Sequence, residues 1–375
     1  MRLPEMMLLI GIALFYSAVA GAAGQADTPK KLRGKSQVRI VCLGDSITDG
    51  NSYPTLLHQA LADAGYEPPL CLNAGVANDT SADMLARLER TVLPLHPTLV
   101  TIMAGTNDLL HGAAGPTQYA EHLTKIAERL KKDKIPLVLL TPPIYGGAPL
   151  PGFDDAVRGV AHTYRYPVAE VSTVMQAAQK QGIEQLEADH VHPNFEGHRA
   201  ITRALLDALG YQDVPVPKEI RITMFPGVIT GWLMRPTKDA VPTLDDTSVL
   251  AVMPDATWKA VVLPESKPQQ SWWSDCERRR GFALSFPDTV GVGSGYQGVA
   301  KLSIETPKKV YFNTGAALRT IWLNGHCLFK KNESMWTGWH AGKERIPAEL
   351  RAGENTIVIE MGSQFFLSVT DGIDW

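Results

Sequence analysis

The chain of 375 residues is long enough for two domains of ordinary size. Its 36 Lys and Arg residues against 39 Asp and Glu residues give a net charge of −3, and 45% of its residues are hydrophobic. This balance argues against a disordered chain and against nucleic acid as the main partner. Four cysteines without a CxxC pair argue against a disulfide scaffold and a cysteine zinc site. Composition therefore predicts a soluble enzyme or binding protein.

The first 22 residues have the pattern of a secretory signal peptide. Residues 6–23 are uncharged and mostly apolar behind Arg2, and alanines near the end of this stretch offer two A-x-A cleavage sites. The alternative is an uncleaved anchor helix, although the apolar stretch is short for a membrane span. We expect cleavage, a linker at 23–36, a secreted or periplasmic location, and no membrane association of the mature protein.

Residues 37–212 alternate short strand-like runs with segments of helical period, which is typical of a parallel sheet covered on both faces. The expected strands are Val38–Leu43, Pro69–Leu72, Leu99–Met103, Leu137–Leu140 and Val168–Val171. Apolar residues at helical spacing predict one helix that ends near Gly65, one that includes residues 123–130, and one that begins after Asn194. The predicted fold class is α/β, with a five-stranded parallel sheet between layers of helices.

Residues 220–375 follow a proline-containing linker at 213–219 and alternate at period two between turn signals, so we expect an all-β domain. The strand-like runs are Ala300–Ile304, Val310–Asn313, Leu318–Leu323, Cys327–Lys330 and Thr356–Met361. Asn324-Gly325 is typical of a two-residue hairpin turn. A β-sandwich or jelly roll is the expected architecture.

All eight tryptophans lie in this second domain: Trp232, Trp258, Trp272, Trp273, Trp322, Trp336, Trp339 and Trp375. One interpretation is that large rings fill the interior of a β-sandwich; the other is that some form a stacking platform for sugar rings. Trp272-Trp273 and Trp336-x-x-Trp339 fit the second better, because adjacent residues on a strand point to opposite faces. Both interpretations remain open at this stage.

A serine follows the first predicted strand, in the run Gly44-Asp-Ser46-Ile-Thr48. Parallel α/β folds place their sites at the carboxyl edge of the sheet, where this serine is expected to lie. Position 48 is Thr rather than Gly, so the run is not the G-x-S-x-G elbow of α/β-hydrolases. The other groups of a site must come from later strand ends.

Later segments supply what a serine nucleophile requires. His192 can take the proton of Ser46 if an acceptor holds its other ring nitrogen, and Asp189 lies three residues away. The tetrahedral oxyanion needs donors, which the backbone N–H groups of Ser46 and Gly75 and the amide of Asn107 supply after their strands. Together these residues form a complete acyl-transfer site that depends on no cofactor.

Each of these residues taken alone has a structural explanation as well. Asn107 could cap the following helix, and Gly75 could mark a turn. His192 and its neighbouring histidines, His190 and His198, could suggest a metal site, but no Cys or carboxylate cluster at ligand spacing accompanies them. We therefore expect no catalytic metal, and we expect His190 to face solvent.

From about Val38 to Gly210 the sequence resembles the SGNH hydrolases, also called the GDSL esterase and lipase family. The resemblance rests on the runs around Ser46, Gly75 and Asn107 and on Asp189-x-x-His192. It implies a flavodoxin-like sheet, a catalytic triad of Ser46, Asp189 and His192, and an oxyanion hole of Ser46, Gly75 and Asn107. The family often has a second glycine three residues after Gly75, where this chain has Asn78.

The second domain is similar to galactose-binding-like jelly rolls attached to carbohydrate-active enzymes. The similarity rests on Asp255-x-x-Trp258, Trp322-x-Asn-Gly325 and Leu350-x-x-Gly-x-Asn355. Because such domains bind ligands through variable loops, the resemblance names no ligand, and Trp336 and Trp339 are the carbohydrate-binding candidates.

Two further groups have competing explanations. Cys42 and Cys71 each lie four residues before a site residue; we interpret them as buried thiols rather than a disulfide, because neighbouring parallel strands rarely suit disulfide geometry. Cys276 and Cys327 could pair in the second domain, which the sequence does not decide. The run Arg278–Arg280 is interpreted as a solvated edge.

Three functions are compatible with these features. The leading hypothesis is a serine esterase that removes acyl groups, acetyl foremost, from carbohydrate. The second is a lipase or acyl-thioesterase of the same family, for which an exposed apolar groove is expected. The third is a carbohydrate-binding module whose hydrolase domain is inactive. Residues 142–153 are the expected source of the loop that shapes the pocket.

Overall fold

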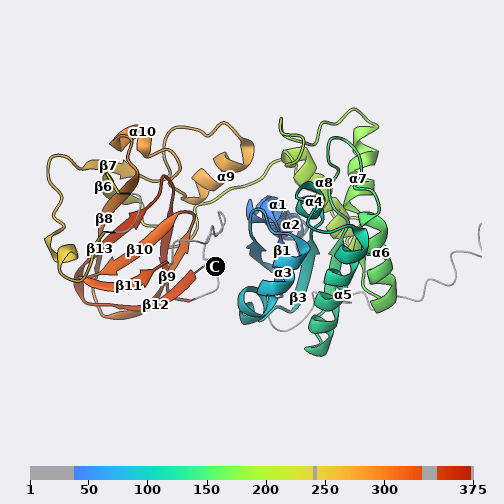
Figure 1. The fold of residues 1–375 in the computed structure, drawn as a ribbon, viewed down its shortest axis with the longest axis horizontal. Helices are drawn as coiled ribbons and strands as arrows, with labels where there is room; N and C mark the ends of the chain where they lie inside the picture. Colours follow the sequence, from blue (N-terminus) through green and yellow to red (C-terminus); the bar gives the residue numbers. More distant parts are fainter. Residues whose placement is uncertain (1–37, 240–242, 332–343, 373–375) are drawn as a thin grey trace, which may run out of the picture.

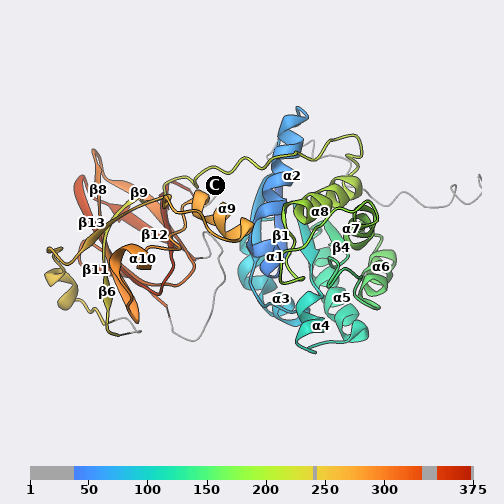
Figure 2. The same cartoon turned by 90° about the horizontal axis from the view of Figure 1, so that it is seen from above.

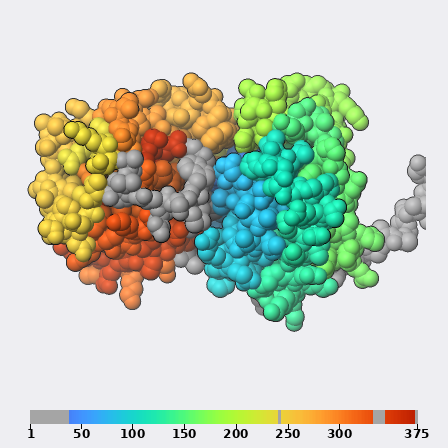
Figure 3. Space-filling model, in the orientation of Figure 1, coloured from blue at the N-terminus to red at the C-terminus, as the bar shows by residue number. Residues whose placement is uncertain are grey.

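The computed structural model describes residues 38–239, 243–331 and 344–372. The expected signal peptide and linker at 1–36, and Trp336 and Trp339, lie outside these described residues. Figures 1 and 3 show two domains side by side, the first built before residue 210 and the second after residue 230. Among the helices of the described residues, none is both long and apolar enough to cross a bilayer.

The first domain is built on a parallel five-stranded sheet in the order β2-β1-β3-β4-β5. Its strands are β1 Arg39–Gly44, β2 Leu70–Gly75, β3 Leu99–Met103, β4 Leu137–Leu140 and β5 Val168–Ala169. Its helices are α1 Ser46–Asp49, α2 Ser52–Asp63, α3 Ser81–Arg87, α4 Thr106–Leu110, α5 Pro116–Lys132, α6 Phe153–Tyr164, α7 Val171–Gln179 and α8 Phe195–Ala208. The predicted α/β class is confirmed, and β3 and β4 have the predicted bounds.

Helices cover both faces of this sheet and create two cores (Figure 2). One core joins the sheet to α3, α5 and α6, through side chains such as Met84, Ile126 and Phe153. The other joins it to α2, α7 and α8, through side chains such as Leu57 and Ile201. Helix α8 begins after Asn194, whose side chain accepts from the N–H of Gly197, as its predicted capping role requires. Because the five strands are parallel, their carboxyl ends all lie at one edge of the sheet.

The second domain contains two antiparallel sheets, as predicted for an all-β domain. The six-stranded sheet has the order β11-β10-β13-β8-β6-β7, and the three-stranded sheet has the order β12-β9-β14. The strands are β6 Gly231–Thr237, β7 Lys259–Val262, β8 Gly295–Ile304, β9 Lys308–Gly315, β10 Leu318–Leu323, β11 His326–Lys330, β12 Glu344–Leu350, β13 Gly353–Met361 and β14 Phe366–Thr370. Asn324 and Gly325 have φ angles of 53° and 87° and form the predicted β10–β11 hairpin turn.

The second domain also contains helices α9 Trp272–Arg280 and α10 Pro287–Val290, and the prediction for the first of these segments is wrong. Trp272 and Trp273 lie on α9, not on a strand, because Ser271 caps a helix there: its side chain accepts from the N–H of Ser274. Arg280, at the end of this helix, is 2% exposed and is not part of a solvated edge. All four cysteines are free thiols.

The segment between the two domains packs along α2. The Gln59 side chain donates to the carbonyl of Glu219 and accepts from the N–H of Arg221, both at 2.9 Å. The Arg221 guanidinium pairs with Asp63 at the end of the same helix. Gln59 is 5% exposed, so the segment covers it.

Candidate active site

Ser46, His192 and Asp189 form one hydrogen-bonded chain. Ser46 Oγ lies 2.9 Å from His192 Nε2, and His192 Nδ1 lies 2.7 Å from Asp189 Oδ2. With Nδ1–H donating to the carboxylate, Nε2 is left as the acceptor for the Ser46 hydroxyl, which is the tautomer that a general base needs. The structure thus brings together the three residues predicted from the sequence.

The positions of the three side chains follow from local structure. Ser46 is the first residue of α1, directly after β1, and Asp45 caps this helix by accepting from the N–H of Ile47. Asp189 Oδ1 accepts from the N–H groups of Val191 and His192, each at 2.9 Å, and so closes a tight turn that places Asp189 and His192 on one side. His190, within that turn, is exposed as expected.

Asp189 is held in its charged form. Partial burial acts to raise the pKa of this carboxyl group, but the hydrogen bonds from the ring and backbone of His192 and from Val191 outweigh burial and hold the pKa below its usual value. A carboxylate in this state fixes the orientation of the imidazole and stabilises its protonated form.

Asn107 lies at the same edge, in the first turn of α4 after β3. Its amide nitrogen donates one hydrogen bond to the carbonyl of Asp79 at 3.0 Å, and the second hydrogen of an amide remains for another acceptor. Asn107 is 7% exposed and lines the cavity at Ser46. This geometry fits the predicted oxyanion donor.

Gly75 is not brought to this cavity, contrary to its predicted role. Its N–H donates to the side chain of Asn73 at 2.8 Å, and the cavity lining includes Ala77 and Asn78 instead. A glycine is needed at 75 for close packing, because a Cβ there would lie 2.2 Å from the backbone nitrogen of Asp49. Asn78 has a left-handed φ of 69°, a conformation that glycine adopts without strain and asparagine adopts more readily than most residues.

The cavity at Ser46 has a volume of about 420 Å³, within the range of about 300–1,000 Å³ typical of small-ligand sites. Its lining residues are Ser46, Ile47, Gly50, Ala77, Asn78, Asn107, Leu110, His111, Val191, His192, Pro193, His198 and Trp273. The loop 142–153, expected to shape the pocket, is not part of this lining. The N–H of Gly146 in this loop donates to the carbonyl of His190, within the turn that contains Asp189 and His192. The lining instead includes Trp273, a residue of the second domain.

Comparison with known proteins identifies the family of the first domain. The sequence profile of the GDSL-like lipase/acylhydrolase family matches residues 42–200. Esterase TesA of Pseudomonas aeruginosa is 30% identical over 167 residues, which cover 41% of this chain and 79% of that protein. The chain belongs to the GDSL-like lipase/acylhydrolase family. The predicted enzyme class, an SGNH-type serine hydrolase acting on ester bonds, is thereby confirmed.

Two further proteins are similar to part of this chain. An acetylxylan esterase of Geobacillus stearothermophilus is 26% identical over 212 residues, covering 46% of this chain and 94% of that protein. The crystal structure of an α/β hydrolase from the metagenome of Lake Arreo is 25% identical, covers 47% of this chain and 96% of its own, and has a TM-score of 0.43.

In this family member a second group of Ser, Asp and His side chains lies away from the cavity. Ser81 Oγ donates to Asp108 Oδ1 at 2.5 Å and lies 2.8 Å from His122 Nδ1, and its backbone N–H also donates to Asp108. Ser81 lies between the other two groups, so the Asp108 carboxylate bonds the serine and does not orient the imidazole. Ser81 and Asp108 are each 0% exposed. Because Asp108 adjoins Asn107, we interpret this group as support for the start of α4.

The second domain contacts the end of α1, the helix that begins with Ser46. Arg280 Nη1 donates to the carbonyl of Gly50, and its Nη2 donates to the carbonyl of Asn51 and to Thr55 Oγ1, all at 3.0 Å. The same guanidinium pairs with Glu277, which is also 2% exposed. Burial raises the pKa of Glu277 to about 7, and the adjacent Arg280 opposes that shift.

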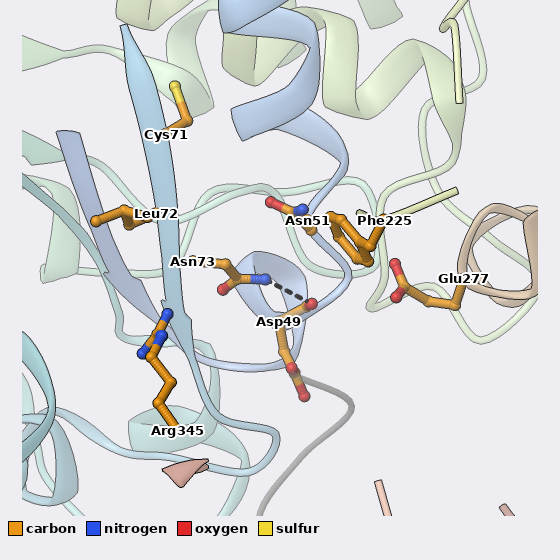
Figure 4. A pocket seen from close by; sticks show the side chains of 8 residues that line it. All are labelled: Asp49, Asn51, Cys71, Leu72, Asn73, Phe225, Glu277 and Arg345. Carbon is orange, nitrogen blue, oxygen red and sulfur yellow. Dashed lines mark hydrogen bonds between the residues drawn. The ribbon is translucent and has the colours of Figure 1, made fainter. Parts of the chain in front are cut away.

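A small cavity of about 40 Å³ lies beside this contact (Figure 4). Its first-domain wall includes Asp49 and Asn73, whose side chain donates to the carbonyl of Asp49 at 2.8 Å. The rest of the cavity lining includes Phe225, which precedes β6, and Glu277 and Arg345 of the second domain. The carbonyls that end α1 are therefore bonded by side chains of both domains, one from β2 and one from α9.

His198 is part of the same interface. Its ring lies between Tyr53, at a centroid distance of 6.4 Å, and Trp272, at 5.5 Å. Burial, with smaller contributions from the charges of Arg280 and His192, lowers its pKa to about 3, so the imidazole is neutral. The described residues contain no group of three or more His, Cys, Asp or Glu side chains placed to hold a metal ion.

Proposed function

We propose that this protein is a secreted or periplasmic serine esterase that removes short acyl groups, acetyl foremost, from carbohydrate. The observation that carries the serine mechanism is the continuous hydrogen-bonded chain from Ser46 through His192 to Asp189 at the edge of a cavity. Two other parts of the proposal, a short acyl group and a carbohydrate as the alcohol, rest on separate observations.

The chemistry follows from the hydrogen bonds. Ser46 Oγ attacks the ester carbonyl carbon while its proton passes to His192 Nε2, and Asp189 stabilises the imidazolium. The Ser46 N–H, the Asn107 amide and the loop at Ala77–Asn78 surround the oxyanion. His192 then protonates the leaving alcohol, an acyl-Ser46 remains, and water attacks it with His192 as base. The acid leaves with Ser46 restored.

Three features support a carbohydrate as the alcohol part. The cavity contains polar side chains, among them Asn78 and His111, next to an indole ring. A relative of similar sequence is described as an acetylxylan esterase. The second domain, proposed to be of the galactose-binding-like type, contributes to the cavity wall through Trp273. The apolar N-terminal stretch supports export.

Replacing Asn107 by Ala is expected to lower kcat by ~10²–10³-fold, because one donor to the oxyanion is removed. The binding of substrate should change much less, so KM is expected to stay within a fewfold of the wild-type value. Steady-state kinetics on a short aryl ester measure both quantities. A loss expressed only in KM would show that Asn107 contacts the ground state and not the oxyanion.

The direct test is acetate release by the mature protein from a panel of acetylated polysaccharides, beside a short aryl ester, with Ser46→Ala as the control. Release from one polymer that is absent in the variant supports the proposal. Cleavage of the aryl ester alone would agree with the serine mechanism and would contradict a carbohydrate substrate. Failure to cleave either favours a non-catalytic binding module.

A lipase or thioesterase is the second candidate, and one observation favours it. Leu109 and Leu110, at the end of α4, are 38% and 40% exposed, and Leu110 lines the cavity. An acyl chain of moderate length would cover these side chains. Aryl esters of increasing acyl length decide between the two: activity that rises with length favours the lipase, and activity that falls from acetyl onward favours the proposal.

A further inference from the structure

Helix α9 of the second domain places an aromatic ring in the cavity that contains the nucleophile. Figures 1 and 2 show α9 on the side of the second domain that faces α1, α2 and α8. Trp273 lines the cavity together with Ser46 and His192, although it is separated from them by more than 80 residues of chain. The second domain is therefore a wall of the site as well as an attached module.

Contacts at both ends of α9 fix the position of Trp273. At the start of the helix the ring of Trp272 packs against Phe195 and His198 of α8, at centroid distances of 5.3 and 5.5 Å. At the end of the helix Arg280 bonds the carbonyls of Gly50 and Asn51. A side chain held on a helix with two anchored ends is pre-organised for binding.

The surroundings of the ring indicate what it contacts. Asn78, Asn107, His111 and His198 bring amide and imidazole groups to the same cavity. A pyranose ring has C–H groups on its faces, which pack on an aromatic ring, and hydroxyl groups at its edge, which need such polar partners. A plain acyl chain offers no hydrogen-bonding group to Asn78 and His111, which are exposed at this cavity.

We propose that Trp273 is a specificity-determining residue on which the sugar ring of the leaving alcohol stacks. This inference rests on the proposed function and assigns its carbohydrate contact to the second domain. It predicts that the indole acts on the alcohol part of the ester and has little effect on the acyl transfer itself.

The test compares two esters in the full-length mature protein. One is the best acetylated carbohydrate of the panel, and the other is ethyl acetate, whose alcohol has no ring. Trp273→Ala is expected to lower kcat/KM on the carbohydrate ester by ~10-fold and to leave that on ethyl acetate within about twofold. Trp273→Phe, which keeps an aromatic face, should restore most of the loss. The deacetylated carbohydrate should inhibit ethyl acetate hydrolysis in the wild type more strongly than in Trp273→Ala.

Leu110→Ala provides a matched comparison, because Leu110 lines the same cavity without an aromatic face. It is expected to change kcat/KM on both esters alike. Equal losses on both esters in Trp273→Ala, or no loss on the carbohydrate ester, would overturn this inference while leaving the proposed function intact. If the wild type cleaves ethyl acetate but no carbohydrate ester, the carbohydrate part of the proposed function fails and the inference fails with it.

Discussion

Replacing Ser46 by Ala is expected to lower turnover of a short acyl ester by ~10⁴-fold or more, because Ser46 is the nucleophile of the proposed mechanism and the other described residues that line the cavity carry neither a hydroxyl nor a thiol group. Ser46 Oγ has His192 as its partner, and the backbone of α1 is held by Asp45 and by contacts from both domains. The fold should therefore be unaffected. The measurement is kcat on the short ester, with circular dichroism to check the fold.

Ser81→Ala is the matched control, since Ser81 also bonds a carboxylate and an imidazole. Its removal leaves buried Asp108 with one partner fewer and is expected to cost about 1–3 kcal/mol of stability, with a much smaller loss of turnover than Ser46→Ala. Near-normal turnover in Ser46→Ala, or an equal loss of turnover in Ser81→Ala, would contradict the proposed mechanism. A fluorophosphonate probe should label the peptide that contains Ser46.

Arg280→Met is expected to destabilise the protein by about 3–5 kcal/mol. The substitution leaves the Glu277 carboxylate and the carbonyls of Gly50 and Asn51 buried without their donor. It also removes a cation from the carboxyl end of α1, which begins with Ser46, so we expect kcat to fall by about 10-fold to 10²-fold as the nucleophile shifts. Urea unfolding followed by tryptophan fluorescence and kinetics on the short ester measure the two effects.

Arg279→Met controls for the loss of a positive charge on α9. Arg279 is 39% exposed and pairs with Asp275 at 3.4 Å, so its replacement should change stability by less than ~1 kcal/mol. Arg280→Lys, which keeps the charge without the planar fork, is expected to fall between the wild type and Arg280→Met. Equal stability and turnover in Arg279→Met and Arg280→Met would mean that the contact between the domains does not position α1.

The first domain could be predicted from the sequence because its strands are buried on both faces and its helices have a clear apolar stripe. The candidate catalytic groups could be predicted because Asp189 and His192 lie in one tight turn and Ser46 lies two residues after the end of a strand. Such local arrangements are encoded within a few residues.

What the sequence did not indicate depends on contacts between distant segments. The sequence predicts Gly75 as an oxyanion donor, yet a glycine is required there by the close approach of Asp49. The run of three arginines predicts a solvated edge, because it does not reveal that its last member, Arg280, enters a domain interface. The two adjacent aromatic residues, Trp272 and Trp273, favour a strand, whereas the cap at Ser271 begins a helix.

The segment that joins the domains is bound along α2 through Gln59, so it does not act as a flexible tether. A tethered module raises the effective concentration of a polymer near a site and leaves its direction of approach free. Here Gln59 holds the joining segment on α2, and Arg280 holds α9 of the second domain against the end of α1. The protein should therefore distinguish substrates by whether they fit between two rigid walls, and it should gain little avidity from longer polymers.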